Sequence, residues 1–146
     1  MKAALSREVF VDASAWIAVS DRRDKFFPAA SAEYTRLIYE RYLLVTTNLV
    51  IAEAYILIRR TGGHASAMRL LGSLNSSPRL IRVYSDARVE SLAEAILGKH
   101  ADQDFSFADA VSFVVMQERG IPAAFTFDSH FASLAFRMLP GNPGAQ

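Results

Sequence analysis

Four acidic residues occupy positions in this chain of 146 residues where their side chains could perform chemistry. Asp12 and Asp128 each follow a short apolar run, and Glu53 is the one charged residue in the apolar stretch LVIAEAYILI. Asp109 lies three residues after Ser106 in the motif S-F-A-D. Carboxylates that converge repel one another unless a cation lies between them, and oxygen ligands suit Mg²⁺ or Mn²⁺. We therefore treat these four acids as candidate ligands of a divalent cation.

A carboxylate site of this kind suits hydrolysis of phosphodiester bonds. The cation activates a water molecule and neutralises charge on the transferring phosphoryl group, so no covalent intermediate is required. Motifs of other enzyme classes are missing: there is no G-x-x-x-x-G-K-[ST] phosphate loop, G-x-G-x-x-G fingerprint or G-x-S-x-G elbow. The sequence therefore argues against a nucleoside triphosphatase, a dinucleotide-dependent dehydrogenase and a serine hydrolase.

Each acid also has a purely structural interpretation. Aspartates such as Asp12 and Asp128 are common as turn or capping residues where a strand meets a helix. Asp109 fits a capping box with Ser106, which explains that pair without any function. Glu53 could lie on a solvated helix edge or pair with an arginine. The recurrence of the strand-to-acid pattern and the cost of burying an isolated charge favour the metal site.

Three more polar residues are secondary candidates. Asp104 lies in the polar segment GKHADQD, where a solvated loop acid is the simpler interpretation. Ser14 and Thr126 place hydroxyl groups beside Asp12 and Asp128, where they could hold a water molecule or cap helices. For Ser14 we predict capping alone.

The histidines and cysteines add no predicted ligand. His64, His100 and His130 are scattered along the sequence, and only His130 lies near the predicted acids. Each is expected to be a surface or packing residue. The chain has no cysteine, which excludes disulfides, thiolate zinc sites, iron–sulfur clusters and a cysteine nucleophile. The predicted ligand set is therefore made of oxygen atoms.

Short apolar runs alternate with helical patterns along the chain. Strands are predicted at 8–12, 43–47, 80–84 and 123–128. Helices are predicted from residue 14 and at 28–42, 48–60, 65–74, 85–97, 106–120 and 129–136, with Ser85 as a cap. This alternation predicts an α/β fold of three layers, a small parallel sheet with helices on both faces. Ligands of such sheets bind beyond the carboxyl ends of the strands, where Asp12 and Asp128 would meet.

Length and composition predict one folded unit. We expect a single domain over residues 1–140 and a flexible tail over 141–146. The chain is 51% hydrophobic and 21% charged, which excludes the disordered class. Its 16 basic and 15 acidic residues exclude a domain that coats nucleic acid through bulk charge. Charged residues interrupt every apolar stretch that a signal peptide or a membrane span would need, so we expect a cytoplasmic protein.

Three motifs are spread along the chain: VFVDASAWIAV, TTNLVIAEAYILI and DQDFSFADAVSFVVMQERGIPAAFTFDSHF. In this order and spacing they resemble the PIN domain family, and most closely its bacterial and archaeal VapC-like toxin branch. The resemblance runs from residue 8 to about residue 136. The fold of that family agrees with the alternation of strands and helices described above.

The resemblance implies a metal-dependent ribonuclease acting on single-stranded RNA. It implies that Asp12 and Asp109 bind Mg²⁺ or Mn²⁺ directly, and that Glu53 and Asp128 complete the site directly or through water. Asp104 stands where some relatives also have an acid. It also implies that the hydroxyl groups of Ser106 and Thr126 orient the groups around the cation.

The resemblance also implies partners: an RNA substrate, a small antitoxin and a second copy of the chain in a homodimer. Cationic side chains near the acids would have to hold the RNA backbone. The candidates for this are Arg22, Arg23, Lys25, Arg59 and Arg60. Trp16, Phe26 and Phe27 fit either a dimer interface or the core.

Alternatives remain open from the sequence. The chain could be a housekeeping RNA-processing nuclease without an antitoxin, or a catalytically silent module that binds nucleic acid on the same fold. A phosphatase similar to haloacid dehalogenases would need an aspartate at position 14, where this chain has Ser14. The sequence therefore disfavours the phosphatase, whereas nothing in it separates a toxin from a processing enzyme.

Overall fold

A five-stranded sheet forms the centre of the structure, a computed structural model that describes residues 7–141. The strand order is β3-β2-β1-β4-β5, and every neighbouring pair is parallel. The strands are β1 (Glu8–Val11), β2 (Leu43–Thr47), β3 (Leu80–Val83), β4 (Ala123–Phe125) and β5 (Arg137–Leu139). The predicted parallel sheet is thus confirmed, with one more strand than the sequence predicted.

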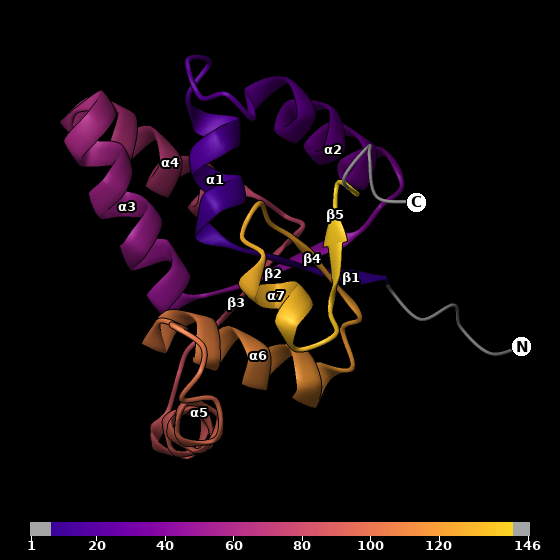
Figure 1. Ribbon diagram of the computed structural model, residues 1–146. Coiled ribbons are helices and arrows are strands. Elements are labelled where there is room, and N and C mark those ends of the chain that lie inside the picture. The colour runs from indigo at the N-terminus through magenta and orange to yellow at the C-terminus, as the bar shows by residue number, and fades with distance from the viewer. Residues whose placement is uncertain (1–6, 142–146) are drawn as a thin grey trace, which may run out of the picture.

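Helices cover both faces of this sheet (Figure 1). They are α1 (Ala13–Ser20), α2 (Phe27–Tyr39), α3 (Asn48–Gly62), α4 (His64–Ser76), α5 (Ala87–Lys99), α6 (Phe107–Arg119) and α7 (His130–Ser133). In Figure 1 the first four lie above the sheet, and α5 and α6 lie below it. The short α7 packs against α6 and β5. The predicted three-layer α/β fold is confirmed.

The core lies along β1 and α6. Val9, Phe10 and Val11 are fully buried, as expected for a central parallel strand that is covered on both faces. Helix α6 is buried continuously from Asp109 to Met116. Phe113 of this helix packs edge-to-face on Phe131, with 5.1 Å between the ring centroids. The element that carries Asp109 is therefore held in the core.

Glycines end two of the helices. Gly63 follows α3 with φ of 88°, and Gly120 follows α6 with φ of 67°. Both values lie in the region that a glycine reaches without steric cost.

The strand order creates a switch point between β1 and β4. After β1 the chain builds β2 and β3 on one side, then returns across the sheet to add β4 and β5 on the other. Ligands of open parallel sheets bind where the order reverses in this way. Asp12 follows β1 and Asp128 follows β4, so both acids lie at this point.

Four predictions about individual elements were wrong. The strand predicted at 123–128 is only β4, which ends at Phe125. Helix α2 ends at Tyr39 rather than at residue 42, because the chain turns at Arg41 with φ of 63°. The cap of α5 is Asp86, whose Oδ1 accepts from the Val89 amide at 2.8 Å, and not Ser85. The helix predicted at 129–136 is only the short α7, after which the chain forms β5.

The predicted tail at 141–146 lies outside the described residues except for Gly141. Within residues 7–141, no helix has the length and apolar character needed to cross a membrane.

Candidate metal centre

Asp12 is held at the start of α1 by the end of the central strand. Its amide donates to the Phe125 carbonyl at 3.1 Å, which ties β1 to β4. The residue is only 5% exposed. Burial raises the pKa of Asp12; hydrogen bonds from the Ala13 amide and the Thr126 hydroxyl oppose this, and the nearby charge of Asp109 adds to it. A buried carboxylate with a raised pKa is the kind of group that a cation stabilises.

Two hydroxyl groups join Asp12 to the segment after β4. Thr126 Oγ1 donates to Asp12 Oδ2 at 2.9 Å, and Ser14 Oγ donates to the same oxygen at 3.1 Å. Ser14 Oγ also accepts from the Phe127 amide at 3.0 Å. The prediction that Ser14 only caps a helix was wrong, because no side chain caps α1 and this hydroxyl bridges two segments.

Asp109 forms two hydrogen bonds with Ser106, one through its amide and one through its carboxylate. Its amide donates to Ser106 Oγ at 2.9 Å, and its Oδ2 accepts from the Ser106 amide at 3.1 Å. The capping box predicted from S-F-A-D is therefore present. The box leaves Oδ1 of Asp109 free of any recorded hydrogen bond within the described residues, so the carboxylate can face a ligand while it caps α6.

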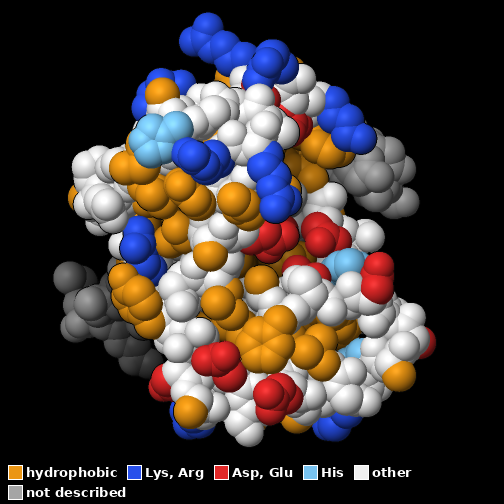
Figure 2. All heavy atoms as spheres, turned by 90° about the vertical axis from the view of Figure 1, so that its left-hand side faces the viewer, with side chains coloured by type: hydrophobic (Ala, Val, Ile, Leu, Met, Phe, Trp, Pro, Cys, Tyr) orange, Lys and Arg blue, Asp and Glu red, His pale blue; other side chains and the backbone are white. Residues whose placement is uncertain are grey.

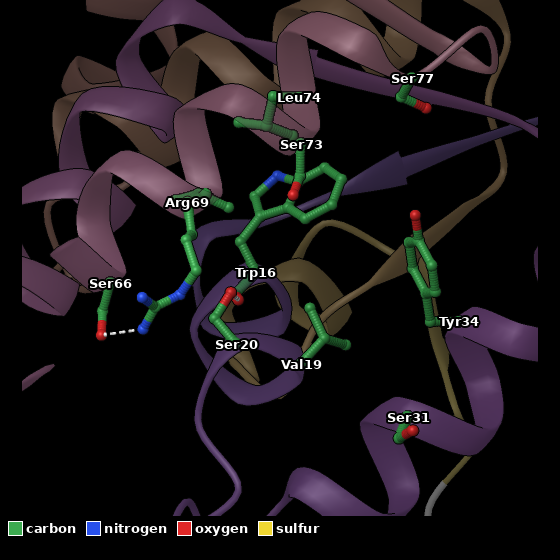
Figure 3. A pocket seen from close by; sticks show the side chains of 11 residues that line it. Trp16, Val19, Ser20, Ser31, Tyr34, Ser66, Arg69, Ser73, Leu74 and Ser77 are labelled. Carbon is green, nitrogen blue, oxygen red and sulfur yellow. Dashed lines mark hydrogen bonds between the residues drawn. The ribbon is translucent and has the colours of Figure 1, made fainter.

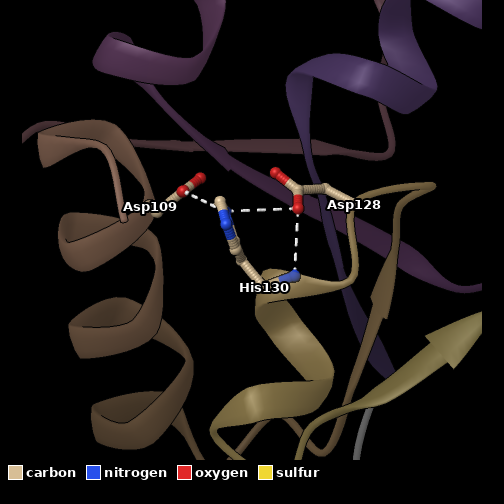
Figure 4. A group of neighbouring side chains, drawn as sticks. All are labelled: Asp109, Asp128 and His130. Atoms are coloured by element: carbon tan, nitrogen blue, oxygen red, sulfur yellow. Dashed lines mark hydrogen bonds and ion pairs between the residues drawn. The ribbon is translucent and has the colours of Figure 1, made fainter. Parts of the chain in front are cut away.

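Asp128 lies in the turn between β4 and α7, beside a histidine. Its amide donates to Thr126 Oγ1 at 3.0 Å, and its Oδ1 accepts from the His130 amide at 2.9 Å. Figure 4 shows Asp109, Asp128 and His130 pointing toward one another from α6, the turn and α7. One ligand atom from each of these three residues lies within 4.8 Å of the others.

Glu53 faces the same cluster from α3. The pKa of this half-buried carboxyl is raised, first by burial and then by the negative charges of Asp12, Asp109 and Asp128. These charges raise the pKa of Glu53 because it lies close to them. The structure thus brings together all four acids that the sequence singled out, which come from segments up to 116 residues apart, from 12 to 128.

His130 is the site residue that the sequence analysis missed. Its Nδ1 lies 3.1 Å from Asp109 Oδ2 and 3.3 Å from Asp128 Oδ1, and its Nε2 lies 2.7 Å from Asp104 Oδ1. Burial alone would lower the pKa of His130, but the hydrogen bond to Asp104 and the charges of Asp128 and Asp109 raise it. The spacing D-x-H was the available signal, because a turn can fold a residue back onto its neighbour two positions earlier.

Asp104 is brought to the cluster only through this histidine. Its own side chain is 95% exposed, in contrast to the buried Asp109. The other two histidines lie elsewhere: His64 contacts Arg59 on α3, and the ring of His100 lies near Phe105.

Acidic side chains gather around a histidine near the middle of the face shown in Figure 2, with basic side chains above them. All five predicted basic residues are exposed. Three of them have neighbours: Arg23 pairs with Asp21 at 3.1 Å, Arg59 Nη1 lies 2.7 Å from His64 Nδ1, and Lys25 Nζ lies 4.9 Å from the centroid of the Phe26 ring. Trp16, a candidate for a dimer interface, is buried in the core instead.

A separate cavity of about 310 Å³ lies between α1, α2 and α4. Figure 3 shows Trp16, Tyr34 and Arg69 around it, with several serine hydroxyls. Its lining includes none of the four acids. The residues with candidate chemistry therefore gather at the edge of the sheet and not in this cavity.

The raised pKa values predict how stability depends on pH when a chelator is present. Because Asp12 and Glu53 hold protons more tightly when folded than when unfolded, the free energy of unfolding should fall as pH rises above their ordinary values of 3.8 and 4.5. The raised pKa of His130 acts in the same direction at higher pH. Urea unfolding between about pH 4 and pH 7 measures this.

Asp12→Asn is the matched variant, because it removes one of these protons and keeps the shape of the side chain. Its free energy of unfolding should fall less steeply over the same pH range. Exposed acids with lowered pKa values, such as Asp21 and Glu118, affect both proteins equally. If the free energy of unfolding fell equally with pH in both proteins, the raised pKa of the buried Asp12 carboxyl would be contradicted.

Comparisons with known proteins bear on the family and the fold of the chain. The sequence pattern of the PIN domain family matches residues 9–137. The 23S rRNA-specific endonuclease VapC20 of Mycobacterium tuberculosis is 31% identical over 129 residues, which cover 88% of this chain and 95% of that protein. The crystal structure of M. tuberculosis VapC20, described as a sarcin–ricin loop cleaving toxin, matches with a TM-score of 0.78 at 30% identity, over 88% of this chain and 95% of that one.

Proposed function

Because the chain belongs to the PIN domain family, we propose that it is a metal-dependent endoribonuclease and the toxin of a toxin–antitoxin pair. The observation that carries this proposal is the convergence of Asp12, Glu53, Asp109 and Asp128 at the switch point of a parallel sheet. The likeness to a toxin endonuclease over 88% of the chain supports it.

The donor set fits a divalent cation. Four carboxylates meet at this point, and two of them, Asp12 and Asp109, are buried. Burial and the charges of neighbouring acids raise the pKa of Asp12 and of Glu53. We assign Asp12 and Asp109 as direct ligands, with Glu53 and Asp128 completing the site directly or through water. Mg²⁺ and Mn²⁺ are the ions that carboxylate oxygens favour.

The bound cation would supply an activated water molecule and neutralise charge on the scissile phosphodiester. The residues of the chain fix the geometry for this. Thr126 and Ser14 hold one carboxylate oxygen of Asp12, and Ser106 holds one of Asp109. Such outer hydrogen bonds keep ligands in position, so the site should need little rearrangement on binding.

We propose ribosomal RNA as the substrate. VapC20 is a 23S rRNA-specific endonuclease, and its structure is described as that of a sarcin–ricin loop cleaving toxin. This chain is similar to it across the domain, so the same loop of 23S rRNA is the first substrate to test. The exposed Arg22, Lys25 and Arg60 are candidates to hold the RNA backbone.

We also propose two protein partners: a small antitoxin and a second copy of the chain. Apolar side chains on α3 and α4 favour a homodimer, because Ile56, Leu57 and Met68 are exposed large hydrophobic residues.

The proposed substrate predicts a cut at one place in the ribosome. Purified protein is incubated with ribosomes and Mn²⁺, and the 5′ ends of the 23S rRNA fragments are mapped by primer extension. We expect one new end in the sarcin–ricin loop and none with Asp12→Asn. A cut elsewhere in the RNA would contradict the proposed substrate but would still support nuclease activity. Intact RNA in every condition would contradict the proposed nuclease activity.

Growth of cells that express the chain separates a toxin from a processing enzyme. We expect expression to arrest growth and co-expression of a small protein encoded beside it to restore growth. Normal growth despite active enzyme would favour the housekeeping nuclease.

A further inference from the structure

An imidazole lies within the acidic cluster, although the sequence predicted a site made of oxygen ligands alone. His130 Nδ1 lies 3.1 Å from Asp109 Oδ2 and 3.3 Å from Asp128 Oδ1. These residues come from α6, from the turn after β4 and from α7. The cluster therefore offers a nitrogen atom on the side that faces two of the assigned cation ligands.

Neighbouring groups fix the orientation of this ring. Nε2 lies 2.7 Å from Asp104 Oδ1, and an ionised carboxylate can only accept, so Nε2 carries the hydrogen in this contact. Phe105 packs edge-to-face on the ring, with 5.3 Å between the centroids and 84° between the planes. The His130 amide is bound to Asp128 Oδ1. Nδ1 lies at hydrogen-bonding distance from Asp109 Oδ2, and a cation bound between these atoms would replace the proton on Nδ1. The lone pair of Nδ1 would then point toward Asp109 and Asp128.

This arrangement is typical of histidines that bind metals. Such a histidine generally donates its second ring N–H to a carboxylate or a carbonyl, which fixes both the tautomer and the ring orientation. Asp104 stands in that position relative to His130. The exposed loop acid thereby acquires a role that does not require it to contact the cation.

The spacing of the ligand atoms also fits a shared ion. Adjacent ligands of a six-coordinate ion lie about 3 Å apart when each is about 2.1 Å from the metal. The two separations from Nδ1, 3.1 Å and 3.3 Å, are close to this value. The three atoms also lie within 4.8 Å of one another as a group.

We propose that Nδ1 of His130 is a ligand of the divalent cation bound by Asp109 and Asp128, and that Asp104 orients the ring. Imidazole nitrogen is a common ligand of transition metals, whereas Mg²⁺ keeps to oxygen. The site therefore favours Mn²⁺ over Mg²⁺. This inference rests on the proposed function, because it assumes that the acids bind a divalent cation.

The test uses Mn²⁺ alone, without RNA. Electron spin-echo modulation of the Mn²⁺-loaded wild-type protein should show coupling to an imidazole ¹⁴N nucleus. The coupling should disappear in His130→Ala and persist in the matched variant His64→Ala, whose histidine lies on α4. Asp104→Asn should keep the coupling and weaken binding, because it removes the charge behind the ring.

Calorimetric titration gives the second readout. His130→Ala should weaken Mn²⁺ binding by at least about tenfold and Mg²⁺ binding by a smaller factor. Circular dichroism checks that each variant is folded. The ¹⁴N coupling in the wild-type protein is measured without any substitution, so it does not depend on the folding of a variant.

Two results would overturn the proposal. Bound Mn²⁺ without ¹⁴N coupling in the wild-type protein would mean that His130 only donates hydrogen bonds to the acids. Equal weakening of Mn²⁺ and Mg²⁺ binding in His130→Ala would lead to the same conclusion. If the wild-type protein binds Mn²⁺ without ¹⁴N coupling and still cleaves RNA, only the inference about His130 fails. If it binds no cation and cleaves no RNA, the proposed function fails with it.

Discussion

Asp12→Asn is expected to lower the rate of RNA cleavage by roughly a thousandfold, since loss of a direct cation ligand removes several kcal/mol of transition-state stabilisation. The fold should survive, because asparagine keeps the shape of the side chain and one acceptor for the Thr126 and Ser14 hydroxyls. Single-turnover cleavage at saturating Mn²⁺ measures the effect on chemistry.

The same substitution should not destabilise the chelated protein at neutral pH. It removes a charge whose pKa is raised by burial, so the free energy of unfolding should stay the same or rise. Asp102→Asn is the matched control, because Asp102 is an exposed aspartate outside the cluster. A variant at Asp12 that cleaves RNA at the wild-type rate would remove this residue from the site.

Substitutions at Asp109 are expected to separate catalysis from stability. Both Asp109→Asn and Asp109→Ala should lose cleavage by a similarly large factor, because neither offers a charged ligand to the cation. Only the alanine variant loses the acceptor for the Ser106 amide, so it alone should lose about 1 kcal/mol of stability. Urea unfolding with a chelator present measures that difference.

Ser106→Ala is the control for the capping contribution. It removes the Oγ that accepts from the Asp109 amide and should cost about 1 kcal/mol of stability. Equal stability of the two Asp109 variants would contradict the role of the carboxylate in the capping box. Full cleavage activity in Asp109→Asn would contradict its role as a ligand.

The layers of the fold were predictable because the signals are local. The central strand β1 is apolar from Val9 to Val11, and α6 begins with a capping box and ends before Gly120. Periodicity and capping are decided within a few residues, so a single sequence contains them.

The elements that were missed depend on distant contacts. Strand β5 has three residues and exists because it pairs with β4. Nothing within Arg137–Leu139 distinguishes an edge strand from a loop. The cap at Asp86 and the early end of α2 are shifts of a few residues, for which neighbouring positions offer equally good signals.

The site also has parts that local sequence predicts and parts that depend on distant contacts. Each of the four acids was conspicuous by its local context, and the order of strands explains why Asp12 and Asp128 meet. The link from Asp104 through His130 to Asp109 joins residues that are 21 and 26 positions apart. Such a contact depends on how α7 packs against α6, which no local pattern records.

The most direct test of the central claim is RNA cleavage under controlled cation. The purified chain is mixed with a pool of structured and single-stranded RNAs in Mg²⁺, in Mn²⁺ and in chelator, beside Asp12→Asn. Our account predicts that the wild-type protein cuts RNA with a divalent cation, stops in chelator and cuts again when the cation is restored. It predicts that Asp12→Asn does not cut RNA in any of these conditions. Cutting that continues unchanged in chelator, or equal cutting by the variant, would contradict a cation site built from these four acids.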